Sequence, residues 1–316
     1  MASSAGVSRR ALLGSAAAAL ALGGARAGAP SSDDAENIQG GADDANRLTV
    51  ETRINGKGPY HFVVDTGADH TVMAADIAAG LGLSAGEPVI VQGITSAVPA
   101  TSVRLRQLSF GRISMENVTV PVLPRAGLGG DGYLGLDAID NRRVVFDFRN
   151  HVLTIGRSPS DWLAEPVHPD EALLRVDGAA GRLTSLDCHV DGVRAHAFID
   201  SGADVTIGNT RLFAELQERS GKTWLTDEPI VLTGVTGATA SGRLVAVSRV
   251  RLGALNFADT LLVIADLPVF ASWGLAERPA LFIGMNYLER TSQVTIDYAR
   301  RELRFKVAAQ RIAGGG

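Results

Sequence analysis

The sequence of 316 residues contains one cysteine, few aromatic residues and no long hydrophobic run, and each scarcity excludes a class of protein. Cys188 alone cannot form an intramolecular disulfide or a cysteine-rich zinc site. The six histidines include no H-E-x-x-H pattern, which would place two zinc ligands on one helical face. The apolar stretch Ala16–Leu22 is shorter than the roughly 20 residues that cross a bilayer. We therefore expect no metal, no cofactor and no membrane span.

Positive charge is also in short supply, with 30 Lys and Arg against 34 Asp and Glu. Phosphate binding needs a concentrated positive surface, so nucleic acid is not an expected partner. The apolar fraction of 46% and the charged fraction of 20% are those of a folded chain with a sizeable core, neither disordered nor fibrous.

The first 27 residues are typical of a twin-arginine signal peptide. Arg9 and Arg10 precede the apolar stretch, and Ala25-Arg26-Ala27 is a small-residue cleavage site. We expect cleavage after Ala27 and a periplasmic or secreted bacterial protein. Residues 28–46 are acidic and glycine-rich, so we expect them to form a disordered arm.

An internal repeat organises the rest of the chain. The segment HFVVDTGAD at 61–69 returns as HAFIDSGAD at 196–204, an offset of 135 residues. Three further landmarks follow in the same order at slowly growing offsets: Gly93–Thr95 with Gly234–Thr236, Leu134–Leu136 with Ile283–Met285, and Asp147 with Asp297. Two copies of one unit predict two similar lobes related by a pseudo-two-fold axis.

The repeat sets the expected domain boundaries. The N-terminal lobe covers 47–157, a linker covers 158–181, the C-terminal lobe covers 182–306, and a flexible tail follows at 307–316. Short β-branched segments between Gly, Pro, Asn and Asp predict an all-β fold. A few short helices are expected at Ala74–Leu81, at Asn209–Glu218, and just after Gly135 and Gly284.

The repeated Asp-Thr/Ser-Gly triplet carries the chemistry. One such triplet at the end of a strand is usually an ordinary turn, but two copies allow the symmetry axis to bring Asp65 and Asp200 together. Two adjacent carboxyl groups cannot both ionise easily, so one keeps a proton. One can then act as general base toward a water and the other as general acid.

These residues resemble the active-site loops of retropepsin-like aspartic proteases. The segments Asp131–Leu136 and Phe282–Met285 resemble the hydrophobic-hydrophobic-Gly motif of the same family. The resemblance implies two retropepsin-like lobes in one chain, with Asp65 and Asp200 as the catalytic pair. It also implies loop-supporting and flap residues, the former being Thr66, Gly67, Ser201 and Gly202, and the latter Gly93, Ile94, Thr95, Gly234, Val235 and Thr236.

The sequence departs from the family after the second glycine motif. Retropepsins place there an arginine that pairs with the aspartate equivalent to Asp69 and Asp204. Here that place is taken by Leu136-Asp137 and Met285-Asn286. Candidate partners are Arg142, Arg143 and Arg290.

The function expected from these observations is that of an exported aspartic endopeptidase, in which a water activated between Asp65 and Asp200 attacks the peptide bond. It would act on a peptide or protein substrate as a monomer, the two lobes forming an intramolecular pseudo-dimer. The alternative is a catalytically silent module of the same fold that binds peptides or acts as a scaffold in the periplasm.

Overall fold

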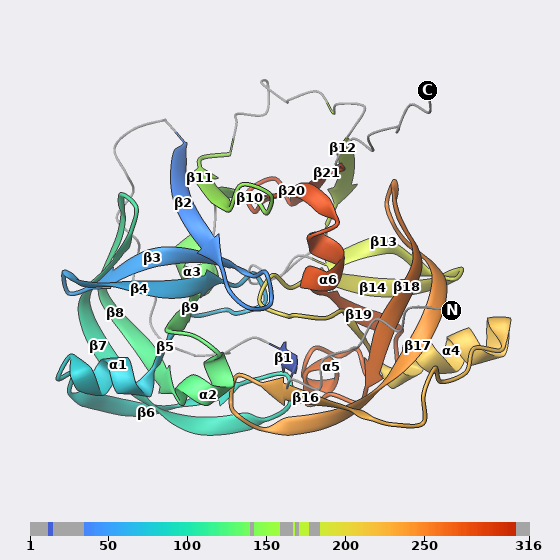
Figure 1. Ribbon diagram of the computed structural model, residues 1–316, viewed down its shortest axis with the longest axis horizontal. Helices are drawn as coiled ribbons and strands as arrows, with labels where there is room; N and C mark the ends of the chain where they lie inside the picture. The colour runs from blue at the N-terminus through green and yellow to red at the C-terminus, as the bar shows by residue number, and fades with distance from the viewer. Residues whose placement is uncertain are drawn as a thin grey trace, which may run out of the picture.

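The computed structural model describes residues 12–14, 35–139, 142–158, 167, 171–176 and 184–307. Strands dominate in both halves of the chain, and Figure 1 shows two lobes side by side with a shared layer of strands above them. The predicted all-β class, with two similar lobes and short helices, is confirmed.

The strands of the first lobe follow from short, alternating or fully apolar segments. Its buried strands, such as Phe62–Val64 at the end of β4, are apolar on every position, and its longer hairpins alternate between buried and exposed residues. The strands are β3 (Leu48–Ile54), β4 (Lys57–Val64), β5 (Val72–Ala74), β6 (Ala85–Gln92), β7 (Ala97–Phe110), β8 (Ile113–Leu123) and β9 (Gly132–Leu134).

The second lobe repeats this topology. In the first lobe β9 lies between β4, to which it is parallel, and β5, to which it is antiparallel; in the second, β19 lies in the same way between β14 and β15. Its strands are β13 (Thr184–Val190), β14 (Val193–Ile199), β15 (Ile207–Gly208), β16 (Ile230–Gly234), β17 (Thr239–Leu252), β18 (Leu255–Ala265) and β19 (Ala280–Ile283).

Six short helices occur in the described residues. Four match the predicted positions: α1 (Ala75–Gly80), α3 (Leu136–Ile139), α4 (Thr210–Ser220) and α6 (Met285–Leu288). The Asn209 side chain caps α4 by accepting from the Leu212 N–H at 2.9 Å. Two helices were not anticipated, α2 (Arg125–Leu128) and α5 (Pro268–Ser272); they lie at equivalent places in the two copies.

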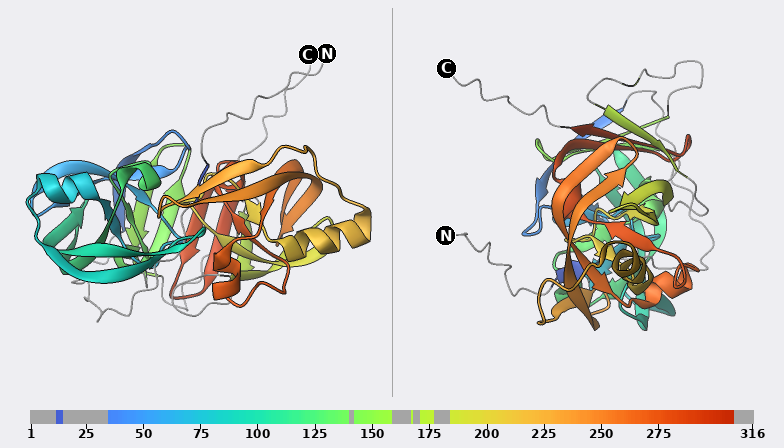
Figure 2. Two further views of the ribbon diagram at one scale, coloured as in Figure 1. Left: turned by 90° about the horizontal axis from the view of Figure 1, so that it is seen from below. Right: turned by 90° about the vertical axis from the view of Figure 1, so that its right-hand side faces the viewer.

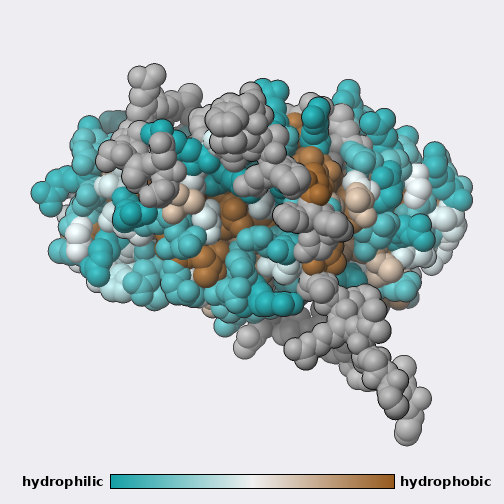
Figure 3. All heavy atoms as spheres, turned by 90° about the horizontal axis from the view of Figure 1, so that it is seen from above, coloured by the Kyte–Doolittle hydropathy of each residue, from teal (hydrophilic) through white to brown (hydrophobic). Residues whose placement is uncertain are grey.

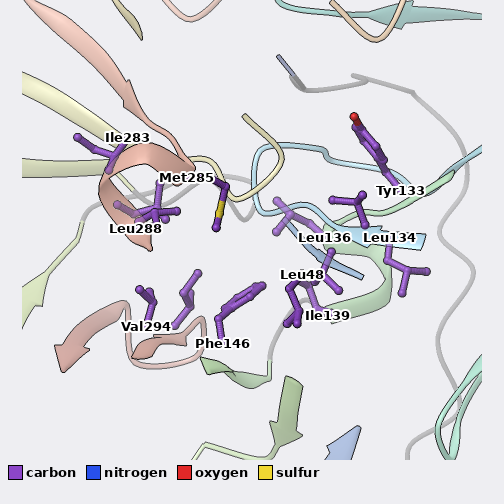
Figure 4. Close-up of a cluster of buried hydrophobic side chains, with 14 of the residues drawn as sticks. Leu48, Tyr133, Leu134, Leu136, Ile139, Phe146, Ile283, Met285, Leu288 and Val294 are labelled. Atoms are coloured by element: carbon purple, nitrogen blue, oxygen red, sulfur yellow. The ribbon is translucent and has the colours of Figure 1, made fainter. Parts of the chain in front are cut away.

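A six-stranded layer joins the lobes. Its order is β12-β21-β20-β10-β11-β2, with one half from each copy and the antiparallel pair β10–β20 at the centre. The strands are β2 (Glu36–Ala42), β10 (Arg143–Asp147), β11 (Val152–Gly156), β12 (Glu171–Arg175), β20 (Thr291–Asp297) and β21 (Glu302–Val307). Helices α3 and α6 pack against this layer (Figure 4) through buried side chains from both copies: Leu136, Ile139, Phe146, Met285, Leu288 and Val294.

Two expected boundaries need correction. Residues 36–42 of the predicted disordered arm form β2, and residues 171–175 of the predicted linker form β12. The polar and glycine-rich β2 has one buried apolar residue, Ile38 opposite Leu153. The short β12 has two, Ala172 opposite Phe305 and Leu174 opposite Leu303. The repeat unit therefore begins one strand earlier than the sequence indicated.

The chain ends lie largely outside the described residues. Within the predicted signal peptide only Leu12–Gly14 is described; it forms β1, paired in parallel with β16. On the face over the shared layer, hydrophilic side chains cover most of both lobes and hydrophobic ones gather toward the middle (Figure 3). No helix in the described part of the chain is long and apolar enough to cross a membrane.

Candidate active site

The two aspartates stand at equivalent strand ends where the lobes meet. Asp65 follows β4 and Asp200 follows β14. The backbone N–H of Asp65 donates to the Leu134 carbonyl at 2.9 Å, and that of Asp200 donates to the Ile283 carbonyl at 3.0 Å. Each loop is thus fixed to the hydrophobic-Gly segment of its own copy, which lies beside it as a parallel strand.

Thr66 and Ser201 lock the two loops together. The Thr66 N–H donates to the Ser201 hydroxyl and the Ser201 N–H to the Thr66 hydroxyl, both at 3.1 Å. Each hydroxyl in turn donates into the opposite copy, Thr66 to the Ile199 carbonyl at 2.9 Å and Ser201 to the Val64 carbonyl at 2.7 Å. Four reciprocal buried bonds hold the loops in register.

The same symmetry brings the carboxyl groups together. Asp65 and Asp200 are 0% and 1% exposed. The Gly67 N–H donates to Asp65 Oδ1 at 2.8 Å, and a Cβ added to Gly67 would lie 2.8 Å from Asp200 Oδ1. Both carboxyl groups therefore border Gly67, and only a residue without a side chain fits there. In the second loop the Gly202 N–H donates to Asp200 Oδ1 at 3.1 Å.

Further hydrogen bonds support both loops. They give a role to Asp137 and Asn286, which follow the glycine motifs where retropepsins have an arginine. Asp137 Oδ1 accepts from the N–H and the hydroxyl of Thr71, at 2.9 and 2.8 Å. Asn286 Oδ1 accepts from the same two groups of Thr206, both at 2.8 Å. A side-chain oxygen thus fastens each loop to the segment that follows its glycine motif.

Arg47 is the ion-pair partner of Asp204, at 3.7 Å. Its guanidinium is buried and also binds Asp43, donates to the Gly202 carbonyl at 3.1 Å and donates to the Tyr133 hydroxyl at 2.7 Å. Burial alone lowers the pKa of Arg47, but the Tyr133 oxygen and the two carboxylates outweigh it and raise the pKa. The side chain therefore carries a permanent positive charge between the lobes.

Arg47 was not among the candidate partners of Asp69 and Asp204, which were Arg142, Arg143 and Arg290. The partner of Asp69 stays a prediction. Sequence reasoning also missed Tyr133. One signal pointed to Arg47: the triplet Arg47-Leu48-Thr49 returns as Arg182-Leu183-Thr184 at the offset of the aspartates. Residue 182 lies outside the described residues.

The predicted flap segments form two hairpin tips that meet (Figure 2). Gly93–Thr95 lie between β6 and β7; Gly234 ends β16, and Val235 and Thr236 lie between β16 and β17. The Thr95 hydroxyl donates to the Ala238 carbonyl at 3.0 Å, and the hydroxyls of Ser96 and Thr236 lie 2.8 Å apart. Each tip also reaches the opposite lobe: Ile94 is 1% exposed within an apolar cluster of the second lobe, and the Val235 carbonyl lies against Gly127 of the first.

No three His, Cys, Asp or Glu side chains are placed to hold a metal ion in the part of the chain that the structure describes. The bordering carboxyl groups can act without one, because a shared proton leaves one group to accept a proton and the other to donate it. The absence of a cofactor stays a prediction.

Comparison with known proteins identifies the family and agrees with the two-lobed fold. A family model described as aspartyl protease matches residues 50–138 and 186–287, which together make up more than half of the chain. Among solved structures, the chain is similar to an aspartic proteinase from Irpex lacteus, with 13% identity and a TM-score of 0.56, over 90% of this chain and 100% of that one. No curated protein sequence matches.

Proposed function

The chain belongs to the aspartyl protease family, and from that premise we propose that it hydrolyses peptide bonds with a water held between Asp65 and Asp200. The observation that carries the proposal is that both buried carboxyl groups border Gly67. Two adjacent buried carboxyl groups cannot both ionise easily, so one would keep a proton and the pair would titrate as a unit.

The reaction would then use both groups in turn. The ionised carboxylate takes a proton from the water as it attacks the peptide carbonyl, and the protonated carboxyl group donates to the carbonyl oxygen. Collapse of the tetrahedral intermediate transfers a proton to the leaving amine. The two hairpin tips would cover the substrate and exclude bulk water, which strengthens each of these interactions.

Two conservative variants test the mechanism. Asp65→Asn and Asp200→Asn each keep the size of the side chain. The amide can neither ionise nor take part in the shared proton. We expect both to lose cleavage of a denatured protein mixture across pH 3 to 8 while they unfold at the wild-type denaturant concentration. Asp227→Asn, at a fully exposed aspartate, is the matched control. Normal cleavage by either active-site variant would refute the mechanism.

Peptide binding without cleavage is the outcome that would favour the alternative function. In that case the folded wild-type protein would leave all peptides intact at every pH. The same protein, immobilised on a column, would still retain some of the peptides. We propose further that the protein is exported, that its signal peptide is cleaved after Ala27, and that it acts as a monomer. Cell fractionation and N-terminal sequencing test the first point, and sedimentation tests the second.

A further inference from the structure

The two halves of the site differ at the residue that precedes each hydrophobic-Gly pair. Tyr133 on β9 corresponds in the repeat to Phe282 on β19. Phe282 lies in an aromatic cluster, with ring centroids 5.7 Å from Phe198 and 4.9 Å from Phe270. Tyr133 instead carries a hydroxyl in the buried space between the lobes, where its ring is 1% exposed.

The Tyr133 hydroxyl has two fixed partners. It donates to the Leu128 carbonyl at 2.9 Å and accepts from Arg47 Nη1 at 2.7 Å. Burial raises the pKa of this phenol, so it stays neutral and keeps both bonds throughout the acidic and neutral range. The next residue on the strand, Leu134, provides the carbonyl that holds the Asp65 N–H.

Arg47 links the Tyr133 hydroxyl to the loop of Asp200. The same Nη1 atom donates to the Gly202 carbonyl at 3.1 Å, and the Gly202 N–H donates to Asp200 Oδ1 at 3.1 Å. On the far side, Nε and Nη2 are held by Asp43. The phenol and Gly202 therefore take the two N–H groups of Nη1, and together with Asp43 they fix the plane of the guanidinium.

Loss of the Tyr133 hydroxyl would leave one N–H group of Arg47 Nη1 without its acceptor. A buried N–H without an acceptor is destabilising, so the guanidinium would turn toward another oxygen. The nearest described candidate is the Asp204 carboxylate at 3.7 Å. Such a rotation would alter its bond to Gly202 and with it the loop that carries Asp200.

We propose that Tyr133 is a positioning residue for catalysis, which sets the Asp200 loop through Arg47 and makes the two aspartates non-equivalent. This inference rests on the proposed function. Phe282 has no hydroxyl, so within the described residues this bond to a phenol is made in one copy only. Asp65 and Asp200 therefore differ in this bond even though their loops have the same backbone bonds.

The test is Tyr133→Phe, which gives position 133 the residue found at 282. The kcat and KM for a fluorogenic peptide are measured from pH 3 to 8, beside the unfolding midpoint. We expect kcat to fall at least tenfold with KM within twofold, and one limb of the pH profile to move by half a unit or more. Tyr60→Phe, at a phenol on β4, is the control and should match the wild type.

The outcomes separate the two claims. If the wild type cleaves and Tyr133→Phe has the same kcat and pH limbs, this inference is overturned and the proposed function stands. A loss of activity that only follows a loss of folded protein, with unchanged pH limbs, also overturns it. No cleavage by the folded wild type overturns both. Should Tyr133→Phe fail to fold, Asp43→Asn loosens Arg47 from its other side, and the same shift in kcat and pH limb is expected.

Discussion

At the residue scale, the reciprocal bonds between Thr66 and Ser201 join the lobes at the point where the chemistry would occur. Ser201→Ala removes the acceptor of the Thr66 N–H and leaves that buried group unpaired. We expect a loss of about 1–3 kcal/mol in the free energy of unfolding, measured by urea titration. Combined with Thr66→Val, the loss should be less than additive because the two side chains share these bonds.

The control for this cycle is Ser292→Ala. Its hydroxyl also donates to a backbone carbonyl, that of Lys306, but at an exposed position. We expect a change within about 0.5 kcal/mol there. Equal losses at Ser201 and Ser292, or strict additivity in the cycle, would show that the lock does not stabilise the protein.

A second prediction at this scale concerns pH. His196 lies half-buried on β14, and burial lowers its pKa, helped by Arg278 and Arg194. Below about pH 6.5 the unfolded chain then binds more protons than the folded one, so stability is lost as the pH falls. Urea unfolding at pH 7.5 and 5 should show a smaller loss for His196→Gln than for the wild type. Arg278→Gln should reduce the loss only partly, and a full wild-type loss in His196→Gln would contradict the assignment.

How much of the site the sequence could predict depends on how local the chemistry is. Asp65, Thr66 and Gly67 act within one tight turn, so their residue types predict that turn. The internal repeat then predicts the equivalent turn at Asp200–Gly202. Arg47 acts on a carbonyl and a carboxylate of the other copy, 155 and 157 residues away. No local pattern encodes such a contact, and only the symmetry of the fold brings it about.

At the scale of elements, the flap of the second lobe rests on the helix α2 of the first. A Cβ at Gly127 would overlap the Val235 carbonyl, whereas one at Gly130 would meet nothing. We expect Gly127→Ala to hinder closure and lower kcat/KM at least tenfold with little change in stability, because alanine favours a helix. Gly130→Ala is the matched control, and equal kinetics for the two variants would refute a role for this contact.

The strand β2 shows why composition misled the boundary prediction. Its glycines and acidic neighbours led to the prediction of a disordered arm. Its backbone nevertheless pairs with β11 on one side and β3 on the other. The backbone hydrogen bonds of a strand do not depend on side-chain type, so composition is a weak guide there. We expect a chain that starts at Ala35 to unfold like the mature protein, and one that starts at Asp43 to lose several kcal/mol in urea titration. Equal stability of the two chains would show that β2 does not stabilise the fold and would favour the predicted disordered arm.

At the scale of the molecule, the shared layer makes the two lobes dependent on each other. β10 of the first copy pairs along its length with β20 of the second, from Arg143 opposite Asp297 to Asp147 opposite Gln293. Neither copy completes this layer alone, and the Thr66–Ser201 lock crosses the same boundary. One cluster of buried apolar side chains also runs through both copies, so the two lobes should unfold together.

Calorimetry distinguishes joint from separate unfolding. Leu105 and Leu252 are both 0% exposed and lie in opposite lobes, on β7 and β17. Replacing either with alanine costs about 2–5 kcal/mol in a well-packed core. If the lobes unfold as one unit, each variant moves a single transition to lower temperature as a whole, with equal calorimetric and van't Hoff enthalpies. If they are independent, the transition splits, and only the half that carries the substitution moves. A split would mean that neither the shared layer nor the Thr66–Ser201 lock couples the unfolding of the two lobes.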